Sequence, residues 1–171
     1  SDRSVKIEIS DLVKTANDIL TGRLDFSTTL SENEEKALLD ILKISTSAGG
    51  ARAKAVIAYN ADTNEVRSGQ VLAPKGFIHW LIKFDGVTDS QFGAAHGYGR
   101  VEMAYHLMAL DAGIEMTECR LLEENGRAHF MTRRFDREPG KTKIHVQSFC
   151  AMQHFDFNDV NSYSYEQLFE T

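Results

Sequence analysis

A segment of small residues with two basic side chains comes directly before a predicted strand. It reads Ser47-Ala48-Gly49-Gly50-Ala51-Arg52-Ala53-Lys54. Small residues let backbone N–H groups approach an anion closely, and Arg52 and Lys54 add positive charge, so the segment could hold phosphate groups. Its spacing is not that of a Walker A loop, and a flexible entry to a strand fits the same pattern.

A lysine and a glutamate lie on predicted elements that are otherwise apolar. Lys83 is near the end of the strand predicted over 77–84, and Glu102 shares a narrow polar stripe with His106 on the helix predicted over 99–112. A charge on such an element needs a partner of opposite sign. We therefore expect Lys83 and Glu102 to face each other, with the lysine directed into a cleft beneath the small-residue segment. A plain structural ion pair is the alternative.

A dense run of charge, Arg133-Arg134-Phe135-Asp136-Arg137, follows the strand predicted over 127–132. Such a run is usually a solvated strand exit, and a ligand-binding role is the alternative. The six histidines show no metal-binding spacing, and His129 and His145 are expected to point outward from their strands. We therefore predict no metal site.

Hydrophobic periodicity predicts the elements that must position these side chains. Helices are expected over 10–21, 31–42, 99–112 and 165–169, and strands over 53–59, 65–72, 77–84, 118–123, 127–132 and 142–148. Asn125-Gly126 is a hairpin turn signal between two of these strands. The order predicts an α+β domain with a mainly antiparallel sheet. Residues 1–44 would be an accessory helical segment whose apolar faces complete the core of a domain over 45–171.

Length and composition exclude several classes of protein. The chain has 171 residues, of which 42% are hydrophobic, and a net charge of −6. It therefore has one domain's length, and its overall charge disfavours direct binding of nucleic acid. The apolar runs are far shorter than the roughly 20 residues that a membrane span needs. Two cysteines and no leader-like opening segment favour a reducing compartment, so the cytoplasm is the expected location.

Four features, taken in order, resemble the HipA-like serine/threonine kinases, the toxin kinases of bacterial toxin–antitoxin modules. They are the small-residue segment 47–54, the strand that carries Lys83, the helix that carries Glu102, and the charged run 133–137. The resemblance runs over about residues 45–171 and implies a sheet-rich N-terminal kinase lobe. It implies that Gly49, Gly50, Ala51, Arg52, Ala53 and Lys54 form the phosphate-binding loop, with Ser47 as an autophosphorylation candidate. It further implies that Lys83 is the nucleotide-phosphate lysine, Glu102 its helix partner, and Arg133, Arg134 and Phe135 the hinge that meets the adenine. Whether Asp136 binds ligand or braces the fold stays open.

One departure from the family limits what this chain should do alone. The family's catalytic and metal-binding aspartate segments do not occur in the sequence. The chain thus looks like the N-terminal lobe and lobe junction of a kinase, with the catalytic lobe missing. We assign it no catalytic residue and no metal ligand, and we expect it to be inactive by itself.

The complete kinase would use ATP and magnesium to phosphorylate serine or threonine on a protein substrate, beside a DNA-binding antitoxin. The alternative is a non-catalytic regulatory module that docks a partner protein such as an antitoxin. A plain structural domain is the third reading.

Overall fold

The computed structural model describes residues 6–20, 53–69, 72–89, 93–94, 97–137, 143–156, 159 and 163–170. Within these ranges a six-stranded sheet has the order β1-β3-β2-β4-β8-β7, and every neighbouring pair is antiparallel. Its strands are β1 (Lys6–Ile7), β2 (Lys54–Asn60), β3 (Glu65–Ser68), β4 (Ile78–Lys83), β7 (Cys119–Glu124) and β8 (Arg127–Arg133). A two-stranded ribbon pairs β5 (Thr88–Asp89) with β6 (Gly93–Ala94).

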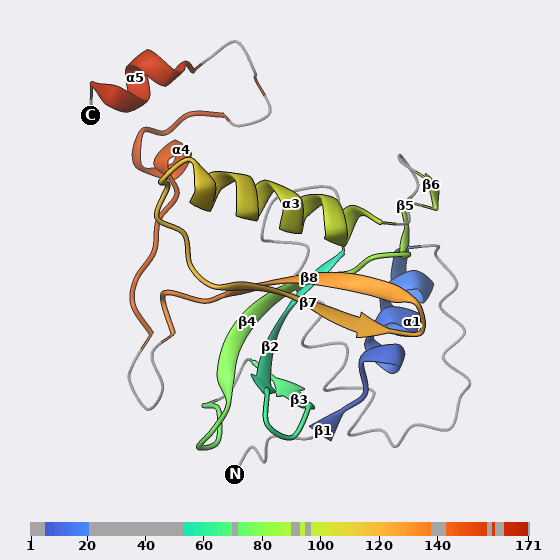
Figure 1. Ribbon diagram of the computed structural model, residues 1–171. Helices are drawn as coiled ribbons and strands as arrows, with labels where there is room; N and C mark the ends of the chain where they lie inside the picture. The colour runs from blue at the N-terminus through green and yellow to red at the C-terminus, as the bar shows by residue number, and fades with distance from the viewer. Residues whose placement is uncertain are drawn as a thin grey trace.

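Four helices complete the described chain: α1 (Ile9–Leu20), α3 (Tyr98–Asp111), α4 (Phe149–Met152) and α5 (Tyr165–Phe169). Figure 1 shows α3 lying across β7 and β8, while α1 lies on the other side of the sheet. The short helices α4 and α5 lie beyond one end of α3. The predicted α+β class with a mainly antiparallel sheet is confirmed.

Turn chemistry fixes both hairpins of the sheet. Asn125 (φ 47°) and Gly126 (φ 77°) have the positive φ values of a type I′ turn, which matches the twist of the β7–β8 hairpin. At the β2–β3 turn, the Asn60 side chain accepts hydrogen bonds from the N–H groups of Asp62 and Thr63 at 2.9 and 3.3 Å. The Asn-Gly turn signal therefore predicted the β7–β8 hairpin correctly.

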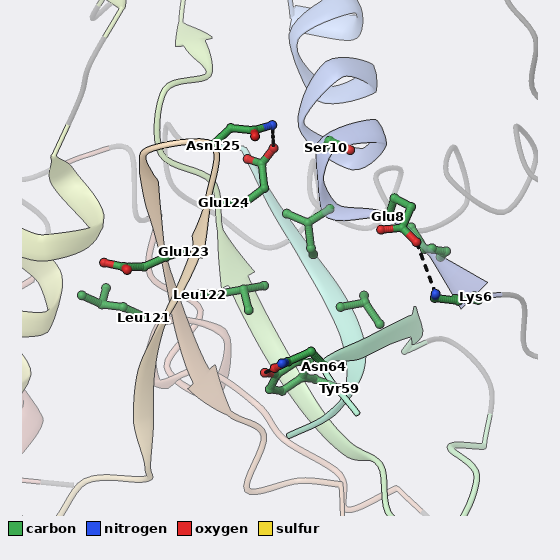
Figure 2. A pocket seen from close by; sticks show the side chains of 13 residues that line it. Lys6, Glu8, Ser10, Tyr59, Asn64, Leu121, Leu122, Glu123, Glu124 and Asn125 are labelled. Carbon is green, nitrogen blue, oxygen red and sulfur yellow. Dashed lines mark hydrogen bonds and ion pairs between the residues drawn. The ribbon is translucent and has the colours of Figure 1, made fainter. Parts of the chain in front are cut away.

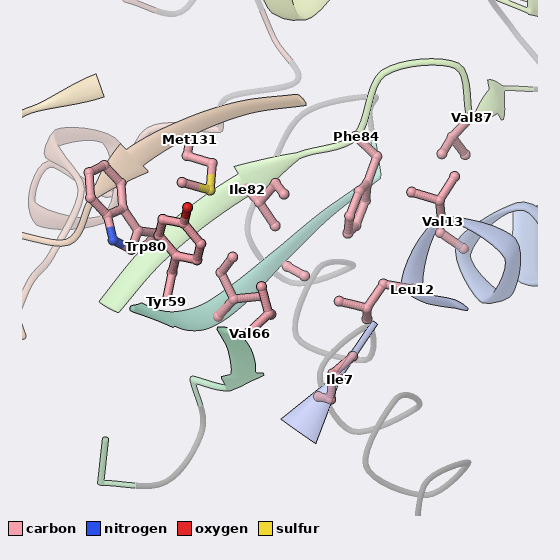
Figure 3. Packing of buried hydrophobic residues seen from close by; sticks show 13 residues of the cluster. Ile7, Leu12, Val13, Tyr59, Val66, Trp80, Ile82, Phe84, Val87 and Met131 are labelled. Carbon is pink, nitrogen blue, oxygen red and sulfur yellow. The ribbon is translucent and has the colours of Figure 1, made fainter. Parts of the chain in front are cut away.

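The hydrophobic core lies between one face of the sheet and α1. Alternation along β4 places Trp80 and Ile82 on this face, and Leu12 and Val13 of α1 pack with them (Figure 3). All four are at most 1% exposed. Burying each large apolar side chain stabilises the fold by roughly 1.5–3 kcal/mol. The N-terminal segment thus supplies core residues, as expected, while its status as a separate unit stays a prediction.

Two of the expected elements need comment. Residues 143–148 form no strand: they are all exposed, and Ile144 N–H donates to the Asp136 carbonyl at 3.1 Å. The prediction of a strand over 142–148 was wrong, because alternation alone does not bring a segment to a sheet edge, and residues 143–148 pair with neither edge strand, β1 or β7. The helix expected over 31–42 lies outside the described residues.

Candidate functional site

The charged pair expected between strand and helix is present. Lys83 ends β4, Glu102 lies in the second turn of α3, and the lysine Nζ is 2.5 Å from the glutamate Oε2. Their side chains are 35% and 26% exposed, so the pair lies at the boundary between sheet, helix and solvent. The Lys83 Nζ is also 5.9 Å from the centre of the Phe130 ring, a contact that favours a cation.

A second lysine shares this face of the sheet. Lys54 begins β2 directly opposite Lys83 in the antiparallel register, and it is only 5% exposed. Burial and, after it, the Lys83 charge lower the pKa of Lys54 from its usual value, and Glu102 partly offsets them. Two lysines therefore lie side by side near the Glu102 carboxylate, an arrangement that suits an anion such as phosphate.

Close contact between backbones holds α3 against the sheet. Gly99 lies in the first turn of α3, and a Cβ built there would be 1.8 Å from the carbonyl oxygen of Ala128 in β8. No side chain fits at this crossing, so glycine permits the close approach. Glu102 follows three residues later, on the adjacent turn, and the close crossing thereby determines how near it comes to Lys83.

A buried aspartate anchors the start of α3. Both carboxylate oxygens of Asp85 accept a hydrogen bond from the N–H of Gly97, at 2.9 and 3.0 Å. Gly97 is the N-cap residue of α3 and has φ 90°. A carboxylate there satisfies a free helix N–H and complements the helix dipole. Because Asp85 comes two residues after Lys83, it ties the lysine's strand to the glutamate's helix.

Asp85 was not expected as a site residue, because Asp85-Gly86 after a strand is typical of an ordinary turn.

The expected orientation of His129 was also wrong. It is fully buried and shares the core face of β8 with Met131, so the prediction that it points outward was wrong. The error arose because alternation assigns two faces, but both faces of this central strand are covered.

The His129 ring connects the anchor of α3 to the β7–β8 hairpin. Its Nδ1 accepts a hydrogen bond from the N–H of Asp85 at 2.9 Å, and its Nε2 is 3.5 Å from the Glu124 carboxylate. This assignment places the proton of the neutral ring on Nε2. Burial lowers the pKa of His129, and the neighbouring Glu124 offsets only part of that effect. His145 is exposed, as expected, although not on a strand.

The charge run after β8 forms its own cluster. Asp136 is 3% exposed, and it accepts hydrogen bonds from Arg134 at 2.6 and 2.5 Å and from Arg137. These contacts lower the pKa of Asp136, with the Arg134 hydrogen bond as the first cause. Asp136 therefore braces this segment. Phe135 is 65% exposed and Arg133 is exposed as well.

The two parts of the expected nucleotide site lie at opposite ends of β4. Lys83 pairs with Phe130, whereas Arg133 pairs with Trp80, three residues along the strand. At about 3.3 Å per residue, this separation is roughly 10 Å. Of the small-residue segment, Ala53 and Lys54 are described, and the Ala53 carbonyl accepts from the Phe84 N–H at 3.0 Å. Ser47, Gly49, Gly50, Ala51 and Arg52 lie outside the described residues, as does the expected covering of the lysine by their loop.

The described part of the chain holds neither a metal-binding cluster nor a membrane-spanning helix. No group of three or more histidine, cysteine, aspartate or glutamate side chains gathers there as a metal site would require. None of the described helices has both the length and the apolar character needed to cross a membrane.

Comparison with known proteins gives one match. A protein-family model described as the HipA-like C-terminal domain matches residues 46–171, most of the chain. No curated protein and no solved structure matches.

Proposed function

We propose that this chain, which belongs to the family of the HipA-like C-terminal domain, is the nucleotide-phosphate-binding part of a serine/threonine protein kinase. The observation that carries the proposal is the ion pair between Lys83 of β4 and Glu102 of α3. In protein kinases a strand lysine contacts nucleotide phosphates, and a helix glutamate orients it. The resemblance to toxin kinases of toxin–antitoxin modules suggests that the parent protein is such a toxin.

The residues at this site fit an ATP phosphate group by charge. Lys83 and Lys54 bring two ammonium groups together beside the carboxylate of Glu102. A phosphate bound there would attract both ammonium groups and favour the protonated form of Lys54, whose pKa burial and Lys83 lower. ATP would supply the phosphoryl group that is transferred. The role we assign to Lys83 and Glu102 is to position and neutralise it.

The end of β8 is the proposed place for the base of the nucleotide. Arg133 and Phe135 are exposed, and Arg133 lies about 10 Å along β4 from Lys83, so phosphates at one end would leave the other end for the adenine. The Arg134 guanidinium already donates to the Asp136 carboxylate, so we assign Arg134 a contact with the adenine through its backbone rather than its side chain.

The catalytic aspartate would have to come from outside residues 1–171. The outward face of α3 is a suitable surface for the part that carries it, because Val101, Tyr105 and Met108 are 48%, 68% and 64% exposed. Apolar residues gathered on one exposed face are typical of an interaction site.

Calorimetric titration of the purified chain with ATP, with and without magnesium, tests this function. Lys83→Met should weaken binding about tenfold or more, because it removes a charged contact to phosphate. Lys75→Met is the matched control, since Lys75 is an exposed lysine in the turn before β4. Equal ATP affinity in the two variants, with unchanged circular dichroism spectra, would contradict the proposal.

A further inference from the structure

A groove opens on the far side of the sheet from the lysine pair. Its volume is about 740 Å³. Residues 6–10 line one wall, residues 121–125 line the other, and Tyr59 and Val66 lie between them. The first wall is formed by β1 and the start of α1, and the second by β7 and its turn, so the two edge strands of the sheet lie on opposite sides of the groove (Figure 2).

At every second residue of β7, the backbone N–H and C=O groups point outward from the edge of the sheet instead of toward β8. In the β7–β8 hairpin the two-residue turn makes Glu124 and Arg127 a hydrogen-bonded pair, and Leu122 and His129 the next. Leu121 and Glu123 lie between these pairs, so their N–H and C=O groups point away from β8. In Figure 2 the side chains of Leu121 and Glu123 point away from α1, while Leu122 points toward it.

Of the usual protections against strand addition, this edge has charged residues but no bulge, proline or lysine. The pairing of β7 with β8 runs without a bulge from Cys119 to Glu124, and β7 contains no proline and no lysine. No described strand pairs with its outer edge. An exposed edge of this kind is a template for another extended segment.

The surroundings of the edge select the chemistry of that segment. Leu122, Ile7 and Val66 give the groove an apolar floor, which suits apolar side chains at every second position. Two of the lining carboxylates, Glu8 and Glu123, lie at the surface, whereas the third, Glu124, is bound by Arg127 at 2.7 Å and is only 15% exposed. The pair of Glu8 with Lys6 and that of Glu123 with Arg100 are more than half exposed, so a new cation can compete for either carboxylate.

We propose that this groove binds an extended segment of a partner protein, with alternating basic and apolar residues, as an added strand along β7. Its backbone pairs with the outward N–H and C=O groups of Leu121 and Glu123. Its apolar side chains face Leu122, and its basic side chains lie on the opposite face of β7, beside Glu123. The whole chain has a net charge of −6, which favours a basic partner over a second copy of itself.

A matched pair of variants isolates the backbone contact. Glu123→Ala and Glu123→Pro both remove the carboxylate and its pair with Arg100, but only the proline removes the outward N–H. The probe is a fluorescein-labelled octapeptide of alternating lysine and valine, titrated with the full chain and followed by fluorescence polarisation. We expect saturable binding, and affinity for Glu123→Pro about tenfold or more below that for Glu123→Ala.

Two changes to the probe keep the test decisive if Glu123→Pro fails to fold. A probe N-methylated at every residue cannot pair along the edge in either strand direction, and a probe with glutamate in place of lysine reverses the charge. Both should bind the unmodified chain about tenfold or more weakly than the original probe. Equal affinity of the original and N-methylated probes, or the absence of saturable binding, would overturn the proposal. Dimerisation that Glu123→Pro abolishes would also overturn it, because a second copy would then be the occupant.

Discussion

Replacing Gly99 by alanine tests how α3 positions Glu102. In an ordinary helix, Gly→Ala stabilises by about 1 kcal/mol, because alanine loses less backbone entropy on folding. Here the added Cβ would be 1.8 Å from the Ala128 carbonyl oxygen, 3.0 Å from the Ala128 carbonyl carbon and 3.2 Å from the Phe130 nitrogen. All three are backbone atoms of β8, so none can rotate away. The clash therefore opposes the gain in helix propensity.

The size of the effect follows from the overlap. Real Cβ atoms essentially never approach within 3.0 Å of such atoms, so the helix must move by about 3.0 − 1.8 = 1.2 Å or more at this point. Overpacking of this kind typically costs 1–3 kcal/mol and sometimes more. Because no β8 backbone atom can rotate away, we expect the upper end of this range, which leaves a net loss of about 2 kcal/mol after the propensity gain, or roughly 4–8 °C in Tm for a chain of this length. Moving α3 should also lengthen the 2.5 Å contact between Glu102 and Lys83.

Urea unfolding followed by circular dichroism measures the change in stability. Val101→Ala is the control in the same helix, since Val101 is 48% exposed and its truncation should change the free energy of unfolding little. A second readout is ATP affinity, which should fall for Gly99→Ala and remain unchanged for Val101→Ala. An unchanged or raised Tm for Gly99→Ala would refute the reasoning, because it would mean that α3 does not lie against β8 as described.

Four further predictions concern stability and reactivity. The pKa of Lys54 is lowered in the folded chain, so between that pKa and 10.5 the unfolded chain binds more protons than the folded chain. The free energy of unfolding should therefore rise with pH in this window. Urea titrations at several pH values should show this rise for the unmodified chain and not for Lys54→Met. Cys119 is 7% exposed and burial raises its pKa, so a thiol reagent should modify the half-buried Cys150 first and Cys119 only after unfolding; equal rates would be incompatible with the fold. Asp136→Asn should cost about 1–3 kcal/mol at pH 7, and its effect should vanish as the pH falls below the lowered pKa of Asp136, which acid titration of both proteins would reveal. Leu12→Ala should cost about 2–5 kcal/mol, and an unchanged unfolding midpoint would show that α1 is not part of the core.

The pair between Lys83 and Glu102 shows what can be predicted from local pattern. Each is a charged residue on an apolar element, where an unpaired charge is costly to bury. Because the two charges have opposite signs, we expected each residue to be the partner of the other. The structure joins them at 2.5 Å. Lys54, by contrast, was expected only as part of a loop. Its place opposite Lys83 depends on the register between β2 and β4, which are separated by the β2–β3 hairpin and the segment that follows it.

The anchor of α3 shows what local pattern misses. Asp85 reads as a turn residue, and only the folded chain brings its carboxylate to the N–H of Gly97, twelve residues later. His129 has the polar character of an outward strand position, yet helix α3 and the core cover the two faces of its strand. Residues 143–148 have the alternation of a strand, yet they pair with neither edge strand of the described sheet.

The sequence by itself determined the type of most elements, the Asn125-Gly126 turn, the α+β class and the charged partners of the candidate site. These follow from periodicity, turn chemistry and the cost of an unpaired charge, all of which act over a few residues or on one residue type. Only the tertiary structure decided which lysines lie side by side, which polar side chains are buried, and that β1 and β7 lie on opposite sides of a groove. Strand register, the placement of the edge strands and the covering of faces arise from contacts between distant segments, and a local pattern is compatible with more than one such arrangement.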